Sequence, residues 1–424
     1  MLKKVSKTKP LKGEIIIPAD KSISHRAVML SSIAQGKCTI KNLSRGADCL
    51  STINLFKQLG ININFKDTNT LEIHGGELIY AKEMLNAGNS GTTMRLVSGI
   101  LAGQKFNSTI IGDMSLSKRP MKRIIEPLML MGADIVSTDN HAPLFIRGKE
   151  LYGIDYQSKL SSAQVKSCIL LAGLNAYGDT IYREPYLSRN HTELMLQYLD
   201  ANIIMNDNIT TIHSGKIFAK DIEIVGDISS AAFFIVAGLI IQGSDFTIRN
   251  VGINPTRIGI LDIVKRMNGN IEVFNERKIS GEPCADIKVK YSENLKSCKI
   301  SGADIPKLID ELPIIAVLAS QAEGETIISN AEDLRNKETD RITSLTNELK
   351  KIGVNIFEKK DGFVIQGKSE LIGNAELRTY HDHRLAMSFY IAGLICKNEI
   401  AIDGFEWTNI SFPEFETLIY KLQQ

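Results

Sequence analysis

The residues best suited to chemistry are cations and hydroxyl residues placed where apolar helices are expected to begin. The stretch GNSGTTMR, residues 88–95, puts small and hydroxyl residues before an apolar helix expected at 94–101. A helix start offers free N–H groups and partial positive charge, which attract anions. Arg95 lies one turn inside, where its planar fork could hold a phosphate or carboxylate. The alternative is an ordinary capped helix with a surface arginine.

Similar cations stand at other expected helix starts. In DKSISHRA, Lys21 lies on the entry turn and Arg26 a turn inside, so that an anion could sit between them with Ser22 donating. A pair of snorkelling surface cations is the alternative. Arg119 of SLSKRPM could also reach a ligand, whereas Arg123 is expected on the outer face of its helix. Arg189 of LSRNHTE could reach a ligand or could be a surface residue at a helix start.

Two carboxylates stand beside cations in the second half of the chain. In LRNKETDRI, Lys337 and Arg341 are four residues apart, with Glu338 next to Lys337. A partly desolvated carboxylate between cations could hold or relay a proton. Alternatively this is a solvated helix face on which Glu338 caps the helix. Asp310 in LIDELP precedes an apolar helix, as either an N-cap or a functional carboxylate.

The cluster His381, Asp382 and His383 invites a metal interpretation, but no further ligand follows at a recognisable spacing. Neighbouring helical residues also point in different directions. We therefore expect no metal, and an anion beside His383 and Arg384. P-loop, GxSxG and HExxH motifs are absent from the sequence.

The elements that position these residues form a sixfold repeat. Each copy has a charged or capping turn, an apolar helix, a β-branched run and a second, amphipathic helix. The six first helices with their flanking turns span 21–36, 89–103, 161–178, 227–243, 310–324 and 382–398. This pattern predicts an α/β fold of two domains, each with three βαβαββ repeats in a pseudo-threefold, barrel-like arrangement.

The repeats also predict where the domains meet. The sixth copy lacks its closing strands, whereas residues 1–18 precede the first copy as a separate strand. We therefore expect a central domain at 19–227, a discontinuous domain of 1–18 plus 228–424, and a two-stranded crossover between them. Threefold stacking would gather the first-helix N-termini on one face of each domain. Two facing domains would then form a cleft suited to a pair of anionic ligands.

Composition narrows the functional class. The net charge of +2 over 424 residues argues against a nucleic-acid partner. The longest apolar run, 231–241, is too short to span a bilayer, and the N-terminus lacks the apolar stretch of a signal peptide. Six cysteines without CxxC spacing indicate reduced thiols, hence a cytoplasmic protein. Since the repeats bury their own faces, we expect a monomer.

Together the motifs resemble one family. The stretches DKSISHRA, GNSGTTMR, SLSKRPM, SSAQVKS, LIDELPIIA, LRNKETDRI, YHDHRLAM and SFPEF resemble those of the EPSP synthases, the 3-phosphoshikimate 1-carboxyvinyltransferases, in family order. The resemblance implies a transferase of the shikimate pathway, which makes aromatic amino acids. It would move the enolpyruvyl group of phosphoenolpyruvate to the 5-hydroxyl of shikimate 3-phosphate, releasing phosphate. The reaction would be an addition–elimination in the cleft between closing domains, without a cofactor.

The resemblance also implies residue roles. Residues expected to bind shikimate 3-phosphate are Lys21, Ser22, Arg26, Ser162, Ala163 (through its backbone), Gln164, Arg189, Asp310 and Lys337. Residues expected to bind phosphoenolpyruvate are Lys21, Gly91, Arg119, Gln164, Arg341 and Arg384. The expected catalytic residues are Asp310, which accepts the 5-hydroxyl proton, Glu338, which donates a proton to the methylene carbon, and Lys21.

Two family features bear on the active site. Some members carry a lysine shortly before the last motif, where this chain has Ile410, so one phosphoenolpyruvate contact is in doubt. Gly91 is the small residue that admits the inhibitor glyphosate in sensitive members, so we expect inhibition.

Three alternatives remain. Enolpyruvyl transferases acting on UDP-N-acetylglucosamine share the fold, but they are expected to carry a catalytic cysteine in the loop that corresponds to 115–120. This chain has no cysteine in that loop. Their Lys-Asn opening is replaced here by Lys21-Ser22. A non-catalytic anion-binding repeat protein and a nucleic-acid-end-processing relative are the others; the near-neutral charge disfavours the latter.

Overall fold

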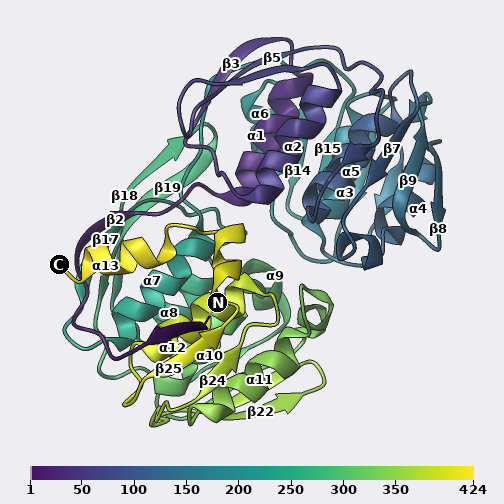
Figure 1. The fold of residues 1–424 in the computed structure, drawn as a ribbon. Coiled ribbons are helices and arrows are strands. Elements are labelled where there is room, and N and C mark those ends of the chain that lie inside the picture. Colours follow the sequence, from purple (N-terminus) through teal and green to yellow (C-terminus); the bar gives the residue numbers. More distant parts are fainter. Residues whose placement is uncertain (1) are drawn as a thin grey trace. The chain divides into compact units, whose positions relative to one another are not determined.

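The structure is a computed structural model that describes residues 2–424, and internal contacts divide the chain into two compact units (Figure 1). Unit 1 comprises the N-terminal segment up to Pro18, Gly226–Arg277 and Pro283–Gln424. Unit 2 comprises Ala19–Val225 and Lys278–Glu282. The chain thus changes unit at 225/226, where the sequence suggests 227/228. The return of 278–282 to unit 2 goes beyond the expected division.

Unit 2 contains three repeats, each built on a four-stranded sheet. The first has sheet order β16-β3-β5-β4, the second β6-β7-β9-β8 and the third β11-β13-β15-β14. The first consists of α1 (Lys21–Ile33), β3 (Gly36–Lys41), α2 (Ala47–Gln58), β4 (Asn62–Phe65), β5 (Leu71–Gly75) and β16 (Ile222–Glu223). The second consists of β6 (Leu85–Asn86), α3 (Gly91–Ala102), β7 (Ser108–Ile111), α4 (Lys122–Leu130), β8 (Asp134–Thr138) and β9 (His141–Arg147). The third consists of β11 (Asp155–Gln157), α5 (Ala163–Gly173), β13 (Thr180–Arg183), α6 (His191–Tyr198), β14 (Ile203–Asn206) and β15 (Ile209–Ile212).

Unit 1 contains the other three repeats. Their sheet orders are β18-β19-β17-β2, β20-β21-β23-β22 and β1-β25-β24. The fourth repeat consists of β2 (Lys12–Ile16), α7 (Ile228–Ile240), β17 (Asp245–Gly252), α8 (Gly259–Arg266), β18 (Ile271–Ile279) and β19 (Glu282–Lys290). The fifth consists of β20 (Lys299–Ile300), α10 (Leu312–Gln321), β21 (Glu325–Ile328), α11 (Arg341–Lys351), β22 (Asn355–Lys359) and β23 (Gly362–Gln366). The sixth consists of β24 (Glu376–Arg378), α12 (His383–Gly393), β25 (Ile400–Asp403), α13 (Phe415–Leu422) and β1 (Leu2–Val5).

Short elements connect these repeats. They are β10 (Leu151–Tyr152), which pairs with β12 (Ala176–Tyr177), the helix α9 (Ile305–Leu308), and the 3₁₀ helices η1 (Leu116–Lys118), η2 (Gly302–Asp304), η3 (Glu332–Asn336) and η4 (Phe405–Ile410). The predicted fold class is confirmed, because every predicted first helix and β-branched run is present in this α/β architecture.

The two crossovers exchange strands between units. β2 precedes the first repeat in sequence but pairs in parallel with β17 of unit 1. Conversely, β16 precedes the fourth repeat but pairs in parallel with β3 of unit 2. The N–H of Asp20 donates to the carbonyl of Val225 (2.8 Å), and that of Asp227 to Pro18 (2.9 Å), so the crossing segments run side by side. As predicted from the incomplete sixth copy, β1 completes the last sheet, antiparallel to β25.

The first helix of each repeat is a core helix rather than a surface helix. Every residue of α7 is buried, and α3 packs against α5 so closely that a Cβ on Gly99 would lie 2.1 Å from the carbonyl oxygen of Cys168. In unit 1, Phe412 and Phe415 of the SFPEF stretch are buried, and Phe415 packs edge-on against Phe234. That stretch therefore contributes to the core. Within 2–424, no helix combines the length and apolar character needed to cross a membrane.

Candidate functional site

The start of α1 holds Lys21 against a carboxylate. Asp20 is the N-cap, and its Oδ1 accepts the N–H of Ile23 (2.9 Å). Lys21 is the first helical residue, and its Nζ lies 3.1 Å from Oδ2 of Asp48 in the first turn of α2. Sequence reasoning missed Asp48, although an acidic residue in the first turn of a helix was the available signal.

The Arg26 guanidinium is enclosed by hydroxyl and carbonyl groups. Its Nε donates to Oγ1 of Thr192 (2.6 Å) and its Nη2 to Oγ of Ser167 (2.9 Å). Its Nη1 donates to the carbonyl oxygen of Ser22 (3.0 Å), so Ser22 and Arg26 are brought together. Burial lowers the pKa of Arg26 to about 10, which leaves it charged at neutral pH. Ser167 and Thr192, distant in sequence, were not predicted.

The start of α3 departs from the sequence interpretation. Arg95 is only 4% exposed, and its Nη1 donates to Oε1 of Gln164 (2.7 Å) on α5. Nε2 of Gln164 in turn donates to Oγ1 of Thr92 (3.2 Å). Arg95 therefore orients a residue of the expected binding set, in place of the direct anion contact suggested by its position.

Gly91 and Arg119 lie near the same helix start. A Cβ at Gly91 would approach Nη1 of Arg95 to 2.7 Å, so that only glycine fits without displacing the arginine. Arg119 follows η1, and its Nη2 donates to Oδ1 of Asn89 (2.9 Å). Asn89 also donates to Asp113 (2.7 Å). These bonds bring Arg119 to the residues that precede α3.

The start of α5 carries Ser162, Ala163 and Gln164, all partly exposed. Ser162 is the N-cap, but its side chain forms no capping hydrogen bond. Arg189 lies half-buried in the loop before α6, and its charge contributes to the lowered pKa of Arg26. The residues expected to bind shikimate 3-phosphate through unit 2 thus lie at the starts of α1 and α5 and just before α6.

In unit 1, Asp310 lies in the turn between α9 and α10, surrounded by cations. Its carboxylate oxygens are 3.8 Å from Nζ of Lys337, 3.7 Å from Nη1 of Arg341 and 3.9 Å from Nη2 of Arg384. Nη1 of Arg384 also donates to the Asp310 carbonyl oxygen (3.2 Å). The N-cap residue of α10 is Glu311, so the interpretation of Asp310 as N-cap is wrong.

Arg341 links three carboxylates. Its Nε donates to Oδ2 of Asp382 and its Nη2 to Oε2 of Glu338, both at 2.7 Å. Burial alone would lower the pKa of Arg341, but the charges of Asp382, Glu338 and Asp310 outweigh burial and raise it. Asp382 also caps α12 by accepting the N–H of Arg384 (2.8 Å). Asp382 therefore places both arginines.

The segment before α11 differs from the helix face considered from the sequence. The helix begins at Arg341 with Asp340 as its N-cap, so Lys337 and Glu338 lie in the preceding loop. The interpretation of Glu338 as the cap is therefore wrong. Lys337 nevertheless reaches Asp310, as Arg341 does.

Further polar groups bond to Glu311, the residue after Asp310. Nη2 of Arg257 donates to Oγ of Ser229 (2.6 Å), and Ser229 donates to the buried Glu311. Arg257 was not singled out from the sequence. His381 stacks on Trp407, 4.6 Å between ring centroids. Among residues 2–424, no group of three or more His, Cys, Asp or Glu side chains is placed to hold a metal ion.

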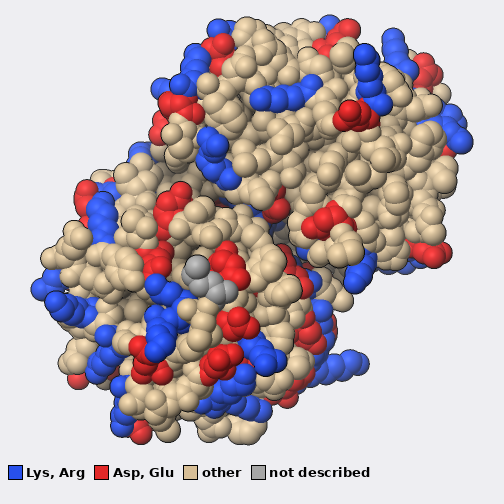
Figure 2. All heavy atoms as spheres, in the orientation of Figure 1, with Lys and Arg blue, Asp and Glu red and all other residues tan. Residues whose placement is uncertain are grey.

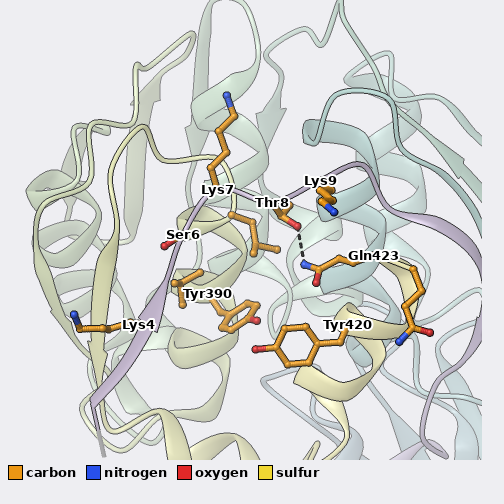
Figure 3. Close-up of a pocket in the computed structure, with 11 residues that line it drawn as sticks. Lys4, Ser6, Lys7, Thr8, Lys9, Tyr390, Tyr420 and Gln423 are labelled. Carbon is orange, nitrogen blue, oxygen red and sulfur yellow. Dashed lines mark hydrogen bonds between the residues drawn. The ribbon is translucent and has the colours of Figure 1, made fainter.

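Two surface features lie apart from these groups. A cavity of about 480 Å³ in unit 1 is formed by both ends of the chain, between Lys4–Lys9 and the end of α13, with Tyr390 and Tyr420 pointing toward it (Figure 3). It contains none of the expected site residues. Figure 2 shows acidic and basic side chains interspersed on the visible face, without a broad area of one sign.

Comparison with known proteins identifies the family. The family model described as EPSP synthase (3-phosphoshikimate 1-carboxyvinyltransferase) matches residues 5–419. The 3-phosphoshikimate 1-carboxyvinyltransferase of a Thermoanaerobacter species is 50% identical over 415 residues, covering 97% of each chain. That of Thermodesulfovibrio yellowstonii is 48% identical over 427 residues, covering 99% of each.

Solved structures agree with this family. An EPSP synthase from Acinetobacter baumannii superposes with a TM-score of 0.91 at 41% identity, covering 99% of this chain and 98% of that one. The enolpyruvyl transferase NikO from Streptomyces tendae shares the fold, with a TM-score of 0.81 at 16% identity. That match covers 99% of this chain and 97% of the other. The chain therefore belongs to the EPSP synthase (3-phosphoshikimate 1-carboxyvinyltransferase) family.

Proposed function

We propose that this chain transfers the enolpyruvyl group of phosphoenolpyruvate to the 5-hydroxyl of shikimate 3-phosphate and releases phosphate. The observation that carries the proposal is the Asp310 group of unit 1, in which one carboxylate has three cationic side chains within 4 Å. A second carboxylate, Glu338, is hydrogen-bonded to one of those cations. A base, an acid and anion-binding groups are what this transfer requires.

The acceptor would be held through its phosphate, its carboxylate and its hydroxyls. Arg189 supplies charge for the phosphate and Arg26 for the carboxylate, while the Ser162 hydroxyl, which forms no capping hydrogen bond, supplies a donor. Ser22, the Ala163 backbone and Gln164 complete the set from unit 2. Lys337 and Asp310 of unit 1 would contact the ring hydroxyls.

Phosphoenolpyruvate carries a phosphate and a carboxylate, so it requires several separate cations. Arg119, with Gly91 and Gln164, would come from unit 2, and Arg341 and Arg384 from unit 1. Lys21 would contact both substrates. Arg341 and Lys21 are paired with carboxylates, which hold these charges in place.

Chemistry would proceed in two steps. In the addition, Asp310 takes the proton of the 5-hydroxyl, whose oxygen bonds to C2 of phosphoenolpyruvate, while Glu338 protonates the methylene carbon. In the elimination, Glu338 takes a proton back from the new methyl group as the bond from C2 to the phosphate oxygen breaks, which restores the double bond. The proton held by Asp310 passes to the departing phosphate. Lys21, Arg341 and Arg384 would stabilise the charge that develops on the phosphate and carboxylate.

The test is phosphate release by the purified protein with both substrates, and with each substrate alone. Release that requires both substrates supports the proposal. Release supported by UDP-N-acetylglucosamine but not by shikimate 3-phosphate would assign the chain to the other acceptor class. Binding of phosphoenolpyruvate without turnover of any acceptor would favour the anion-binding protein.

Asp310→Asn and Glu338→Gln are matched variants for the two proton transfers. Both keep side-chain size and remove the charge. We expect each to lower kcat by about 10²-fold or more, the scale of a positioned acid or base. Lys122→Met on the exposed face of α4 is the control and should keep wild-type turnover.

The state and location of the enzyme belong to the same proposal. We expect a monomer of 46.9 kDa, which sedimentation in the presence of both substrates would check. A cytoplasmic location rests on the biosynthetic reaction and on the six cysteines, whose positions in the sequence show no CxxC spacing.

A further inference from the structure

A buried group of charges in unit 2 has no part in the roles described so far. Nζ of Lys166 lies 2.7 Å from Oε1 of Glu184 and 2.8 Å from Oε1 of Glu193. All three side chains are about 1% exposed. Buried ion pairs seldom add stability over well-packed apolar residues, because the charges lose their hydration. What these residues position is therefore informative.

One arm of this cluster fixes the backbone just before Arg189. The Ser188 N–H donates to Oε1 of Glu184 (2.8 Å), and Nζ of Lys166 donates to the Ser188 carbonyl oxygen (3.2 Å). Both backbone polar groups of Ser188 are thus held by the ion pair. The direction in which Arg189 leaves the chain depends on that anchoring.

The other arm lies behind Arg26. Arg26 donates hydrogen bonds from Nη2 to Ser167 and from Nε to Thr192. Ser167 follows Lys166 in the sequence, and Thr192 precedes Glu193. The Ser167 and Thr192 hydroxyls are themselves 2.7 Å apart. The cluster therefore connects to both arginines that are expected to bind the acceptor.

Electrostatics explain why such an anchor is needed. The charge of Arg189 disfavours the charged form of Arg26, whereas Glu193 favours it. Two arginines that repel each other gain from a fixed frame if they are to meet the separate anionic groups of one acceptor. Arg26 and Lys166 carry two positive charges and Glu184 and Glu193 two negative, so the frame itself is neutral.

We propose that Lys166, with Glu184 and Glu193, is a positioning residue that presets Arg189 for the acceptor phosphate beside the fixed Arg26. It sets the preference for a phosphorylated over an unphosphorylated acceptor without touching either. This inference rests on the proposed function.

Glu184→Gln tests one arm with little change in shape. The glutamine oxygen can still accept a hydrogen bond from the Ser188 N–H, but the negative charge that pairs with Lys166 is lost. The double variant Lys166→Met with Glu184→Gln removes one charge of each sign, and leaves the charge of Glu193 in place to favour the charged form of Arg26. Dissociation constants of shikimate 3-phosphate and shikimate are measured by calorimetry, together with KM for both substrates, kcat and the unfolding temperature.

Each variant is expected to weaken shikimate 3-phosphate binding about tenfold, the scale of a displaced positioning group. Shikimate binding and KM for phosphoenolpyruvate should stay within about twofold, so that the preference for the phosphate falls by the same tenfold. A merely structural role would weaken both acceptors together or lower the active fraction. The exposed Lys122→Met variant serves as control.

The outcomes separate the two proposals. A folded variant with an unchanged ratio of the two dissociation constants overturns this inference, and so does failure of both variants to fold, which would make the cluster structural. Wild-type protein that releases no phosphate from the two substrates would instead overturn the proposed function.

Discussion

Gly91 and Arg95 show how a glycine can make room for a side chain that orients another residue, here Gln164, which is proposed to bind both substrates. A methyl at Gly91 would lie 2.7 Å from Nη1 of Arg95, which is buried and bonded to Gln164. We therefore expect Gly91→Ala to push Arg95 off Gln164 and raise KM for phosphoenolpyruvate. Because the displaced atom is the end of a long side chain, the main loss is the Arg95–Gln164 hydrogen bond, and we expect KM to rise about tenfold, the scale of a hydrogen bond to a charged group.

Inhibition kinetics with glyphosate check the same position. Wild-type enzyme should be inhibited competitively with phosphoenolpyruvate, and Gly91→Ala should be inhibited more weakly. Gly215→Ala is the control, because a Cβ there meets no atom within 4 Å. An unchanged wild-type rate at millimolar glyphosate, or equal inhibition of both proteins, would contradict this prediction.

His25 predicts how stability depends on pH. It is buried, with Nδ1 2.7 Å from Oγ1 of Thr52, and burial lowers its pKa to about 3. The unfolded chain, with a histidine pKa near 6.5, therefore binds more protons than the folded chain between those values. Stability is full above pH 6.5 and falls on acidification toward pH 3, by up to about 1.4 kcal/mol per pH unit.

Urea unfolding from pH 7 to pH 4.5 measures this contribution. His25→Asn is expected to be less stable than wild type at pH 7, where it lacks ring packing, but the difference should narrow as the pH falls. His74→Asn, at an exposed side chain, should give a curve parallel to wild type. A His25→Asn curve that is also parallel would contradict the assignment.

At the residue scale, the sequence revealed which groups could act but not what holds them. Helix-start chemistry pointed to Lys21, Arg26 and Arg341 because capping and anion binding follow local rules. Their partners Asp48, Thr192 and Asp382 lie on other helices, and no local spacing relates them. For the same reason, a local interpretation aimed Arg95 at a ligand, whereas a neighbouring helix supplies Gln164.

At the element scale, the contact between α3 and α5 is the feature most sensitive to substitution. Because a Cβ on Gly99 would meet backbone, 2.1 Å from the Cys168 carbonyl oxygen, the helices must separate to admit it. We expect Gly99→Ala to reduce the free energy of unfolding by about 1–3 kcal/mol or more. Denaturant unfolding measures it, with Gly76→Ala as an open-space control. Equal losses in both variants would argue against close packing.

Helices and strands were predictable because apolar periodicity and capping depend on residues that are close together in the sequence. Their exact limits were not. α2 begins at Ala47, earlier than the apolar pattern from 50 suggests, and α11 begins at Arg341, later than the pattern from 339 suggests. Asp340 fixes the start of α11 because its side chain accepts the N–H groups of Ile342 and Thr343, whereas Gly46 precedes α2 without a side-chain cap.

At the scale of the whole molecule, repetition was the strongest signal. Six similar units and an incomplete last copy predicted that the N-terminal strand joins the C-terminal part, as β1 and β2 do. The placement of 278–282 in unit 2 depends on tertiary contacts, such as that between Nδ1 of His191 and Oε1 of Glu282 (2.8 Å). Sequence periodicity carries no information on such contacts.

The proposed sharing of Lys21 and Gln164 by both substrates predicts that their binding is coupled. Whichever ligand binds first fixes these side chains, so the second loses less conformational freedom on binding. Glyphosate, as an unreactive stand-in for phosphoenolpyruvate, should therefore bind at least about fivefold more tightly with shikimate 3-phosphate present, and the reverse effect must be equal. Calorimetry in both orders measures this. Gln164→Ala should reduce the coupling, and Gly215→Ala should leave it unchanged. Independent binding in the wild type would show that the two sets of residues act separately, and would remove the reason for assigning Lys21 and Gln164 to both substrates.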